Sequence, residues 1–326
     1  MLSPKGRFAT RWSILIVCLA LICSGAALAQ EQPSAGSSGP SCAEMEEFLR
    51  TARVGAMRNV PKGVTLPRRA TLDNGKLKHD AAIQTIDEKR TSYQTARGTE
   101  LNFRDYWGYN IAGYELAKIL ELNMVPPYVA RNHGGKWASF SWWIDVMMDE
   151  VDRMRRKADP PDLDTWNKEM YVVRVFNQLI YNMDDNLTNF LITPDWHIWM
   201  IDFSRAFRTH KTLLNPKNLV QCDRKLLAKL RQLDTKMLEE KLVTPKYLTK
   251  MELDGLSARA QKIVQFFDEE IARKGEAAVL FDLPRVGQPC GVGIPSASST
   301  GSNRSMNDEP TKKANGNKPI PAKSGT

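Results

Sequence analysis

The spacing of hydrophobic and polar positions first predicts a small antiparallel sheet. A short helical pattern over 45–52 precedes two strands, which we expect at 63–71 and 76–86. The second strand alternates apolar and polar residues, as a half-buried strand does. The sequence Asp-Asn-Gly at 73–75 lies between the strands, and Asn and Gly tolerate the positive φ that a tight turn requires. These two strands are therefore predicted to form a hairpin.

A helix and a second pair of strands follow along the chain. Apolar residues recur at helical spacing over 103–121. Prolines at 126 and 127 prevent the helix from continuing. Further strands are expected at 128–131 and 137–144, and another helix near Asp145.

The remaining pattern is mostly helical, interrupted by one short hairpin. A helix is predicted to begin at Asp164 or Thr165, either of which can cap it. The loop 182–189 then leads into two short strands, 190–193 and 197–201. Helical spacing returns from 215 to 274. The predicted class is α+β, with two lobes: a small antiparallel-sheet N-lobe containing one long helix (about 45–145), and a mostly helical C-lobe (about 146–286).

The two ends of the chain differ in character from this domain. Residues 1–29 have a basic start, a short apolar run and an Ala-Leu-Ala segment, so we expect a signal peptide cleaved near Ala29 and export to the periplasm or medium. The alternative is a retained membrane anchor, but the run is shorter than the roughly 20 residues that span a bilayer. Residues 30–44 are expected to form a flexible linker. The Ser-, Gly- and Pro-rich tail 287–326 is expected to be disordered.

Composition and charge exclude some classes of protein. The chain has 326 residues, 42% hydrophobic and 25% charged, which is ordinary for a globular protein. Its net charge of +9 is spread along the chain without a nucleic-acid-binding motif, so nucleic acid is not expected as a partner. Cys42, Cys222 and Cys290 would remain after signal cleavage. That odd number permits one disulfide, and the absence of a Cys/His cluster argues against structural zinc.

The most informative residues surround the short hairpin. Asp184 is followed five residues later by Asn189, and the two strands then end at Asp202. Mg²⁺ prefers oxygen ligands and usually binds through one or two carboxylates together with substrate phosphates. The hairpin would bring Asn189 and Asp202 to one end, and Asp184 could face an acceptor hydroxyl as a base. The alternative is a polar turn with no chemical role, since Asp and Asn favour turns on their own.

This spacing resembles the catalytic loop and metal-binding Asp of protein kinases, D-x-x-x-x-N followed by a hairpin and D-F-G. It is more similar to atypical kinases: the phosphatidylinositol 3-/4-kinase-like, HipA-type and secretory-pathway kinases. It also resembles a group of exported bacterial proteins of unassigned role. The resemblance covers about residues 45–282. It implies Asp184 as catalytic base, Asn189 and Asp202 as metal ligands, and ATP with Mg²⁺ or Mn²⁺ as cofactors.

The resemblance also directs attention to the nucleotide-binding positions. Glu115 lies in the first long helix, where kinases place the Glu that pairs with a strand Lys. The Lys position itself holds Gln84, which carries no charge. Lys62, just before the first strand, could supply the missing positive charge. Asp185, beside the base, would repel phosphate unless a metal neutralised it.

The sequence thus leaves three functions open. The first is an ATP/Mg-dependent phosphotransferase of atypical kinase type, acting on an unknown protein, lipid or small-molecule hydroxyl. The alternative is an inactive pseudokinase that serves as an exported nucleotide-binding or protein-interaction module. The third is a cell-envelope interaction protein in which the hairpin is only structural.

Overall fold

The computed structural model describes residues 39–60, 67–95, 98–184 and 186–284. The predicted signal peptide, most of the predicted linker and the predicted C-terminal tail lie outside these ranges. Lys62 and Asp185 also lie outside them, so both remain predictions from sequence.

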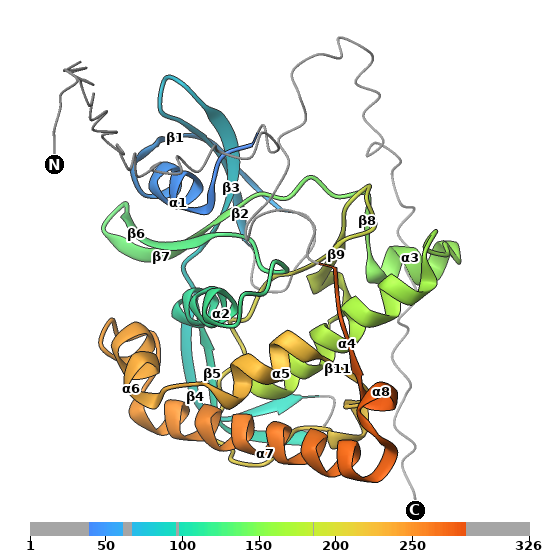
Figure 1. Cartoon of the computed structure of the whole chain (residues 1–326). Helices are drawn as coiled ribbons and strands as arrows, with labels where there is room; N and C mark the ends of the chain where they lie inside the picture. Colours follow the sequence, from blue (N-terminus) through green and yellow to red (C-terminus); the bar gives the residue numbers. More distant parts are fainter. Residues whose placement is uncertain (1–38, 61–66, 96–97, 185, 285–326) are drawn as a thin grey trace, which may run out of the picture. The chain divides into compact units, whose positions relative to one another are not determined.

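A five-stranded antiparallel sheet forms the N-terminal part of the domain (Figure 1), with strand order β1-β2-β3-β7-β6. Gly75, with a φ of 84°, makes the turn between β2 and β3, as predicted. Gly134 and Gly135 also have positive φ, at the turn between β6 and β7. The strands are β1 (Arg53–Asn59), β2 (Arg68–Asp73), β3 (Lys78–Gln84), β6 (Tyr128–His133) and β7 (Lys136–Trp142).

Helix α1 (Cys42–Thr51) covers one face of this sheet. It begins with a capping box in which the Ser41 hydroxyl accepts from the Glu44 N–H, and the Glu44 carboxylate accepts from the Ser41 N–H. Buried apolar side chains of α1, among them Met45 and Phe48, pack with Phe140 and other residues of the strands. The alternation of each strand therefore leaves the opposite face, which includes Gln84, directed away from α1.

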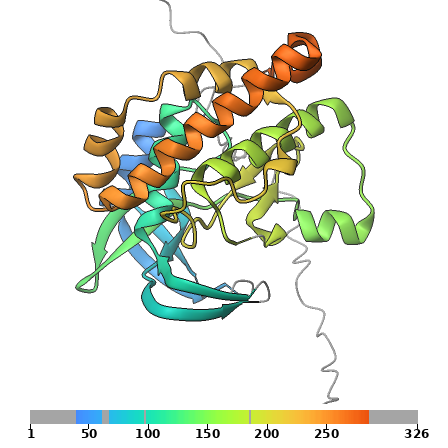
Figure 2. The ribbon, with the colours of Figure 1, turned by 90° about the horizontal axis from the view of Figure 1, so that it is seen from below.

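The structure corrects the prediction of one helix over 103–121. Residues up to Tyr106 belong instead to a long hairpin, β4 (Asp87–Thr95) with β5 (Gly98–Tyr106), and only Gly108–Ile119 is helical, as α2. The buried residues Phe103 and Asp105 alternate with partly exposed Arg104, which is the period of a strand. The hairpin leaves the sheet and extends along the helical part, as the teal ribbon shows in Figures 1 and 2.

Helix α2 is anchored on several sides. The Tyr114 hydroxyl and the Lys118 ammonium each donate to the Glu46 carboxylate of α1, both at 2.9 Å. The Tyr109 hydroxyl donates to Glu252 in helix α7 (Lys250–Lys274). Helix α2 therefore contacts both the N-terminal and the C-terminal helices.

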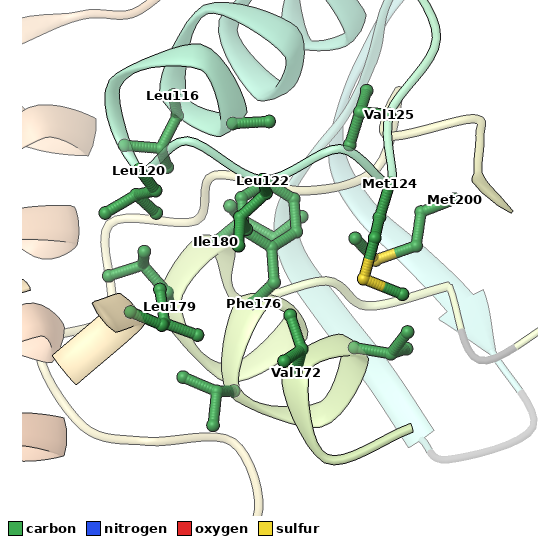
Figure 3. Close-up of a cluster of buried hydrophobic side chains, with 14 of the residues drawn as sticks. Leu116, Leu120, Leu122, Met124, Val125, Val172, Phe176, Leu179, Ile180 and Met200 are labelled. Atoms are coloured by element: carbon green, nitrogen blue, oxygen red, sulfur yellow. The ribbon is translucent and has the colours of Figure 1, made fainter. Parts of the chain in front are cut away.

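The C-terminal part is helical, as predicted. Asp162 caps helix α4 (Leu163–Ile180), whose apolar face packs against residues that follow α2 in a buried cluster (Figure 3). The other elements are β8 (Met148–Asp149), α3 (Glu150–Arg156), η1 (Leu187–Asn189), β9 (Phe190–Ile192), β10 (Ile198–Met200), η2 (Pro216–Asn218), β11 (Cys222–Asp223), α5 (Arg224–Arg231), α6 (Thr235–Leu238), η3 (Glu239–Val243), α8 (Glu276–Val279) and β12 (Leu280–Phe281).

Two smaller features complete the fold. Strand β9 pairs with β10 and β8, and β11 pairs in parallel with β12. Cys222 is a buried free thiol, whereas Cys42 is disulfide-bonded. Within those residues, no helix is both long and apolar enough to cross a membrane.

Candidate nucleotide and metal site

The loop between α4 and β9 holds Asp184 and Asn189 together. The Asp184 N–H donates to the Asn182 side-chain oxygen at 3.1 Å, and the Asn186 N–H donates to Asp184 Oδ1 at 3.1 Å. These short-range bonds fold the loop into successive Asx turns. The Asn189 amide nitrogen lies 3.5 Å from Asp184 Oδ2, within hydrogen-bond range. The predicted base and the predicted amide ligand are thus neighbours.

The hairpin β9–β10 brings Asp202 to the same end as Asn189. Phe190 pairs with Met200, and the Ile201 N–H donates to the Asn189 carbonyl oxygen at 3.0 Å. Asp202 itself has a φ of 57°, a left-handed conformation that is uncommon for residues other than Gly. Its N–H donates to the Tyr128 hydroxyl at 3.5 Å. Burial, together with the charge of Asp202, raises the pKa of Tyr128.

Gln84 lies against Asp202 and connects it to α2. The Gln84 amide nitrogen donates to Asp202 Oδ1 at 3.3 Å, while its oxygen accepts from the Asn110 amide nitrogen at 2.5 Å. Asn110 is fully buried, and its own oxygen accepts from the Phe203 N–H at 2.6 Å. Two neutral amides thus connect β3, α2 and the segment that follows β10.

Glu115 lies within helix α2, and its role in nucleotide binding stays a prediction. Glu115 forms an ion pair with Lys118 of its own helix at 2.9 Å and does not pair with a residue of β3. Asn110, more than one turn earlier in α2, contacts Gln84 instead. Gln84 and Asn110 thus form a pair of neutral amides between β3 and α2.

Asp105, which sequence reasoning missed, lies beside the site. It is the penultimate residue of β5 and is only 6% exposed. Burial raises the pKa of Asp105; a hydrogen bond with the Ser204 side chain opposes this rise, and the nearby charge of Asp202 adds to it. Among its own sequence neighbours Asp105 looks like an ordinary polar strand residue. The sequence therefore held no signal for its position.

The basic residues after Asp202 are engaged by the β4–β5 hairpin. Arg208 Nε lies 2.6 Å from Glu100 Oε1, and Arg205 Nη2 lies 3.9 Å from Glu100 Oε2. Both guanidinium groups also lie over the Phe103 ring. The hairpin that the sequence did not predict thus contacts the segment after Asp202 through Glu100 and Phe103.

A polar pocket of about 230 Å³ lies over the same face of the sheet as Gln84. Asp80 and Gln84 are an even number of residues apart on β3 and so share a face. Arg69 donates to Asp80 at 2.5 Å, and its guanidinium stacks 4.1 Å above the Trp143 ring. The pocket is lined by Arg69, Thr71, Lys78, His79, Asp80, Trp143 and Asp145.

The donor set suits a hard divalent cation. Asp202 and the Asn189 side chain both offer oxygen atoms, and Oδ1 of the nearby Asp105 has no hydrogen-bond partner. Mg²⁺ and Mn²⁺ prefer carboxylate and amide oxygens. Among the described residues there is no cluster of three or more Asp, Glu, His or Cys side chains. A cation here would therefore complete its coordination with water or phosphate oxygens.

Comparison with solved structures defines the class of fold. The hydra Fam20 structure with sugar aligns with a TM-score of 0.57 and 13% identity, over 74% of this chain and 92% of that one. The Golgi casein kinase aligns with a TM-score of 0.53 and 14% identity, over 75% and 80%. The Helicobacter pylori kinase CtkA aligns at 0.40 and 9% identity, over 67% and 93%, too distant to carry an argument.

The sequence comparisons are negative: no protein-family model and no curated protein matches this chain. The fold is nonetheless clear. It is an α+β kinase-like fold with an antiparallel N-terminal sheet and a helical C-terminal region. Within that class, the protein is structurally similar to hydra Fam20 and the Golgi casein kinase.

Proposed function

We propose that this protein is a metal-dependent phosphotransferase that takes its phosphoryl group from ATP. The observation that carries the proposal is the convergence of Asp184, Asn189 and Asp202 at one end of the β9–β10 hairpin in a kinase-like fold. Phosphoryl transfer asks the protein mainly for positioning and charge neutralisation. The three side chains can provide both.

Each residue has a distinct proposed role. Asn189 and Asp202 hold Mg²⁺ or Mn²⁺, which when bound neutralises charge on the phosphates. Asp184 lies on the loop beside Asn189 and is not assigned to the metal. Its carboxylate is therefore available to orient the acceptor hydroxyl and to accept its proton. Gln84 fixes the Asp202 carboxylate through its amide. Lys62 stays a proposed phosphate contact from sequence alone.

We propose that the rest of the nucleotide binds in the polar pocket. It lies on the Gln84 face of β3, and Trp143 offers an aromatic surface for a base. The acceptor is an alcohol of unassigned class. The hydra Fam20 structure contains a sugar and the Golgi enzyme is named as a casein kinase, so sugar and protein hydroxyls both belong in the first screen.

Calorimetric titration with ATP, with and without Mg²⁺, tests the proposal without knowledge of the acceptor. We expect metal-dependent binding that Asp202→Asn weakens by at least about tenfold, since a charged ligand contact is worth roughly 1.5–3 kcal/mol. The matched control is Asp195→Asn, which removes a carboxylate from the exposed turn of the same hairpin and should bind normally. ATP binding that is unaffected by Mg²⁺ would contradict the proposal.

A second candidate function is favoured by the amide pair. Gln84 and Asn110 stand where kinases have an ion pair, and a neutral amide cannot attract phosphate as a lysine does. The protein would then bind nucleotide as a regulatory module without transferring phosphate. A sensitive assay of slow ATP hydrolysis distinguishes the two functions. If the protein is a phosphotransferase, the wild type hydrolyses ATP slowly, and Asp184→Asn abolishes this hydrolysis without abolishing ATP binding. If it is a regulatory module, the wild type binds ATP but does not hydrolyse it.

We also propose that the protein acts outside the cytoplasm. The N-terminal 29 residues support this proposal, because they have the basic start, short apolar run and small-residue end of a signal peptide. Mass spectrometry of the full chain expressed in a bacterium tests it. A mature protein beginning at Gln30 is expected, and an intact Met1 in the cell envelope or medium would contradict cleavage.

A further inference from the structure

We propose that Asp105 is a second carboxylate of the metal site, so that a divalent cation binds between Asp105 and Asp202. This inference rests on the proposed function, since it concerns the same cation. It assigns a ligand from the β4–β5 hairpin, an element outside the loop and strands that supply Asp184, Asn189 and Asp202.

The backbone holds Asp105 close to Asp202. The Tyr106 N–H, one residue after Asp105, donates to the Ser204 carbonyl oxygen at 2.8 Å. The Ser204 N–H in turn lies 3.4 Å from Asp202 Oδ1. The Asp105 side chain hydrogen-bonds the Ser204 side chain as well. The end of β5 and the segment after β10 thus run side by side, with both carboxylates on the shared boundary.

One oxygen of Asp105 is without a partner among the described residues. Asp105 is only 6% exposed, and its Oδ1 atom receives no hydrogen bond. A buried carboxylate oxygen without a donor is costly, and most buried polar atoms in proteins are satisfied. The orphaned oxygen therefore points to a ligand that supplies positive charge.

Among the described residues, Arg205 supplies some positive charge near Asp105 but no hydrogen bond to its Oδ1. Gln84 of β3, which donates to Asp202, is a neutral amide. Arg205, the nearby guanidinium, lies by Glu100 at 3.9 Å and over the rings of Tyr93 and Phe103. Glu88, across the hairpin from Asp105, adds a further negative charge. Two neighbouring carboxylates, one of them with an unsatisfied buried oxygen, form an environment in which a hard divalent cation binds well.

Direct Mn²⁺ binding tests this inference without nucleotide and without an acceptor. Free Mn²⁺ is measured by electron paramagnetic resonance during titration of the full chain. Asp105→Asn, which keeps the shape and removes the charge, should weaken Mn²⁺ binding by at least about tenfold, the scale of loss on removing groups around a metal. Asp87→Asn removes an exposed carboxylate from the same hairpin and should leave Mn²⁺ affinity unchanged.

Two further measurements guard against loss of folding. Without metal, Asp105→Asn should melt at the same or a higher temperature than the wild type, because it removes the repulsion between two neighbouring carboxylates. Mn²⁺ should then raise the melting temperature of the wild type but not of Asp105→Asn. Asp105→Glu, which restores the charge, should recover part of the Mn²⁺ affinity.

The outcomes separate this inference from the proposed function. If Asp202→Asn loses Mn²⁺ and Asp105→Asn does not, Asp105 is not a ligand and the inference is overturned, while the proposed metal site stands. If both variants lose Mn²⁺ but the wild type does not bind ATP, the inference stands and the phosphotransferase proposal falls. Failure of the wild type to bind Mn²⁺, with or without ATP, overturns the inference.

Discussion

Gln84 is the residue through which strand β3 contacts both Asp202 and helix α2. A lysine can only donate hydrogen bonds, whereas an amide donates and accepts at once. Gln84 uses both groups, donating to Asp202 and accepting from Asn110. The Asn110 amide supplies the donor that the Gln84 oxygen needs. A carboxylate at position 110 would instead place two acceptor oxygens against each other. The two amides therefore form a consistent pair, and changing either one alone should be costly.

Asn110→Asp should destabilise the protein by about 2–4 kcal/mol, because it buries a charge and removes the donor to Gln84. Adding Gln84→Lys should recover at least half of that loss by providing an opposite charge. Denaturant unfolding of the wild type, both single variants and the double variant measures the coupling. Effects that add to within about 0.5 kcal/mol would show that the two positions are independent.

At the scale of elements, helix α2 packs closely against the segment after β10 because position 113 is a glycine. A Cβ added to Gly113 would lie 2.5 Å from the Phe203 ring, one residue after Asp202. Phe203 is itself 1% exposed and packs edge-on against Phe176 of α4. The ring has little space to move, so the distance between α2 and Asp202 depends on Gly113.

Gly113→Ala should therefore destabilise the protein by about 1–3 kcal/mol, the usual cost of overpacking. A loss of stability would be informative, because replacing Gly by Ala within an exposed helix normally increases stability by about 1 kcal/mol. Thermal denaturation measures the change. Phe203→Leu should partly rescue Gly113→Ala, and stabilisation by Gly113→Ala alone would show that the ring can yield.

A second link between elements predicts a pH dependence. His197, beside β10, contacts Glu169 of α4 at 2.8 Å and the Asn123 carbonyl oxygen at 2.6 Å. Burial opposes the charged ring, but the hydrogen bond and charge of Glu169 outweigh burial and raise the pKa of His197 above 6.5. The folded state therefore holds this proton more tightly than the unfolded state does.

The resulting stability is fully present below about pH 6.5 and is lost as the pH rises through the raised pKa of folded His197. Urea unfolding of the wild type and of His197→Gln at pH 6 and pH 9 isolates it. The wild type should lose more stability than His197→Gln between these values. An equal loss in both proteins would mean that His197 does not titrate differently on folding.

The elements also show what the sequence could and could not predict. The turn at Gly75, the helix α4 and the hairpin β9–β10 were predictable, because local turn residues and periodicity specify them. The hairpin β4–β5 was not, since polar strand residues such as those of 87–95 carry little apolar alternation. Strand β1 was missed for the same reason. Glu115 lies within the predicted helix, where it pairs with Lys118, and its role stays a prediction. Asp105 becomes meaningful only through a contact with residues almost 100 positions away.

On the scale of the whole molecule, Arg259 joins segments that lie far apart in the sequence. Its guanidinium is fully buried in α7 and donates to the carbonyl oxygens of Leu179, Arg208 and His210. Burial lowers its pKa to about 10. The helix α7 is thus fixed both to the end of α4, just before the Asp184 loop, and to the segment after Asp202.

Arg259→Met should cost about 3 kcal/mol or more, because it leaves buried carbonyl oxygens without donors. Arg273→Met, in the exposed last turn of the same helix, is the control and should stay within about 0.5 kcal/mol of wild type. Guanidinium unfolding measures both. Similar losses for the two variants would indicate that Arg259 contributes only through its helix.

The anchoring of α2 also bears on how the protein would respond to a ligand. Helix α2 is bonded to α1 at one end, to α7 at the other, and to β3 and the Asp202 segment between them. A helix held on all these sides has little freedom to lose, so binding should carry a small ordering entropy. Amide hydrogens of α2 should exchange at rates near those of global unfolding even without nucleotide, and ligand should slow them little. The protein would then behave as a receptor already set in its binding conformation.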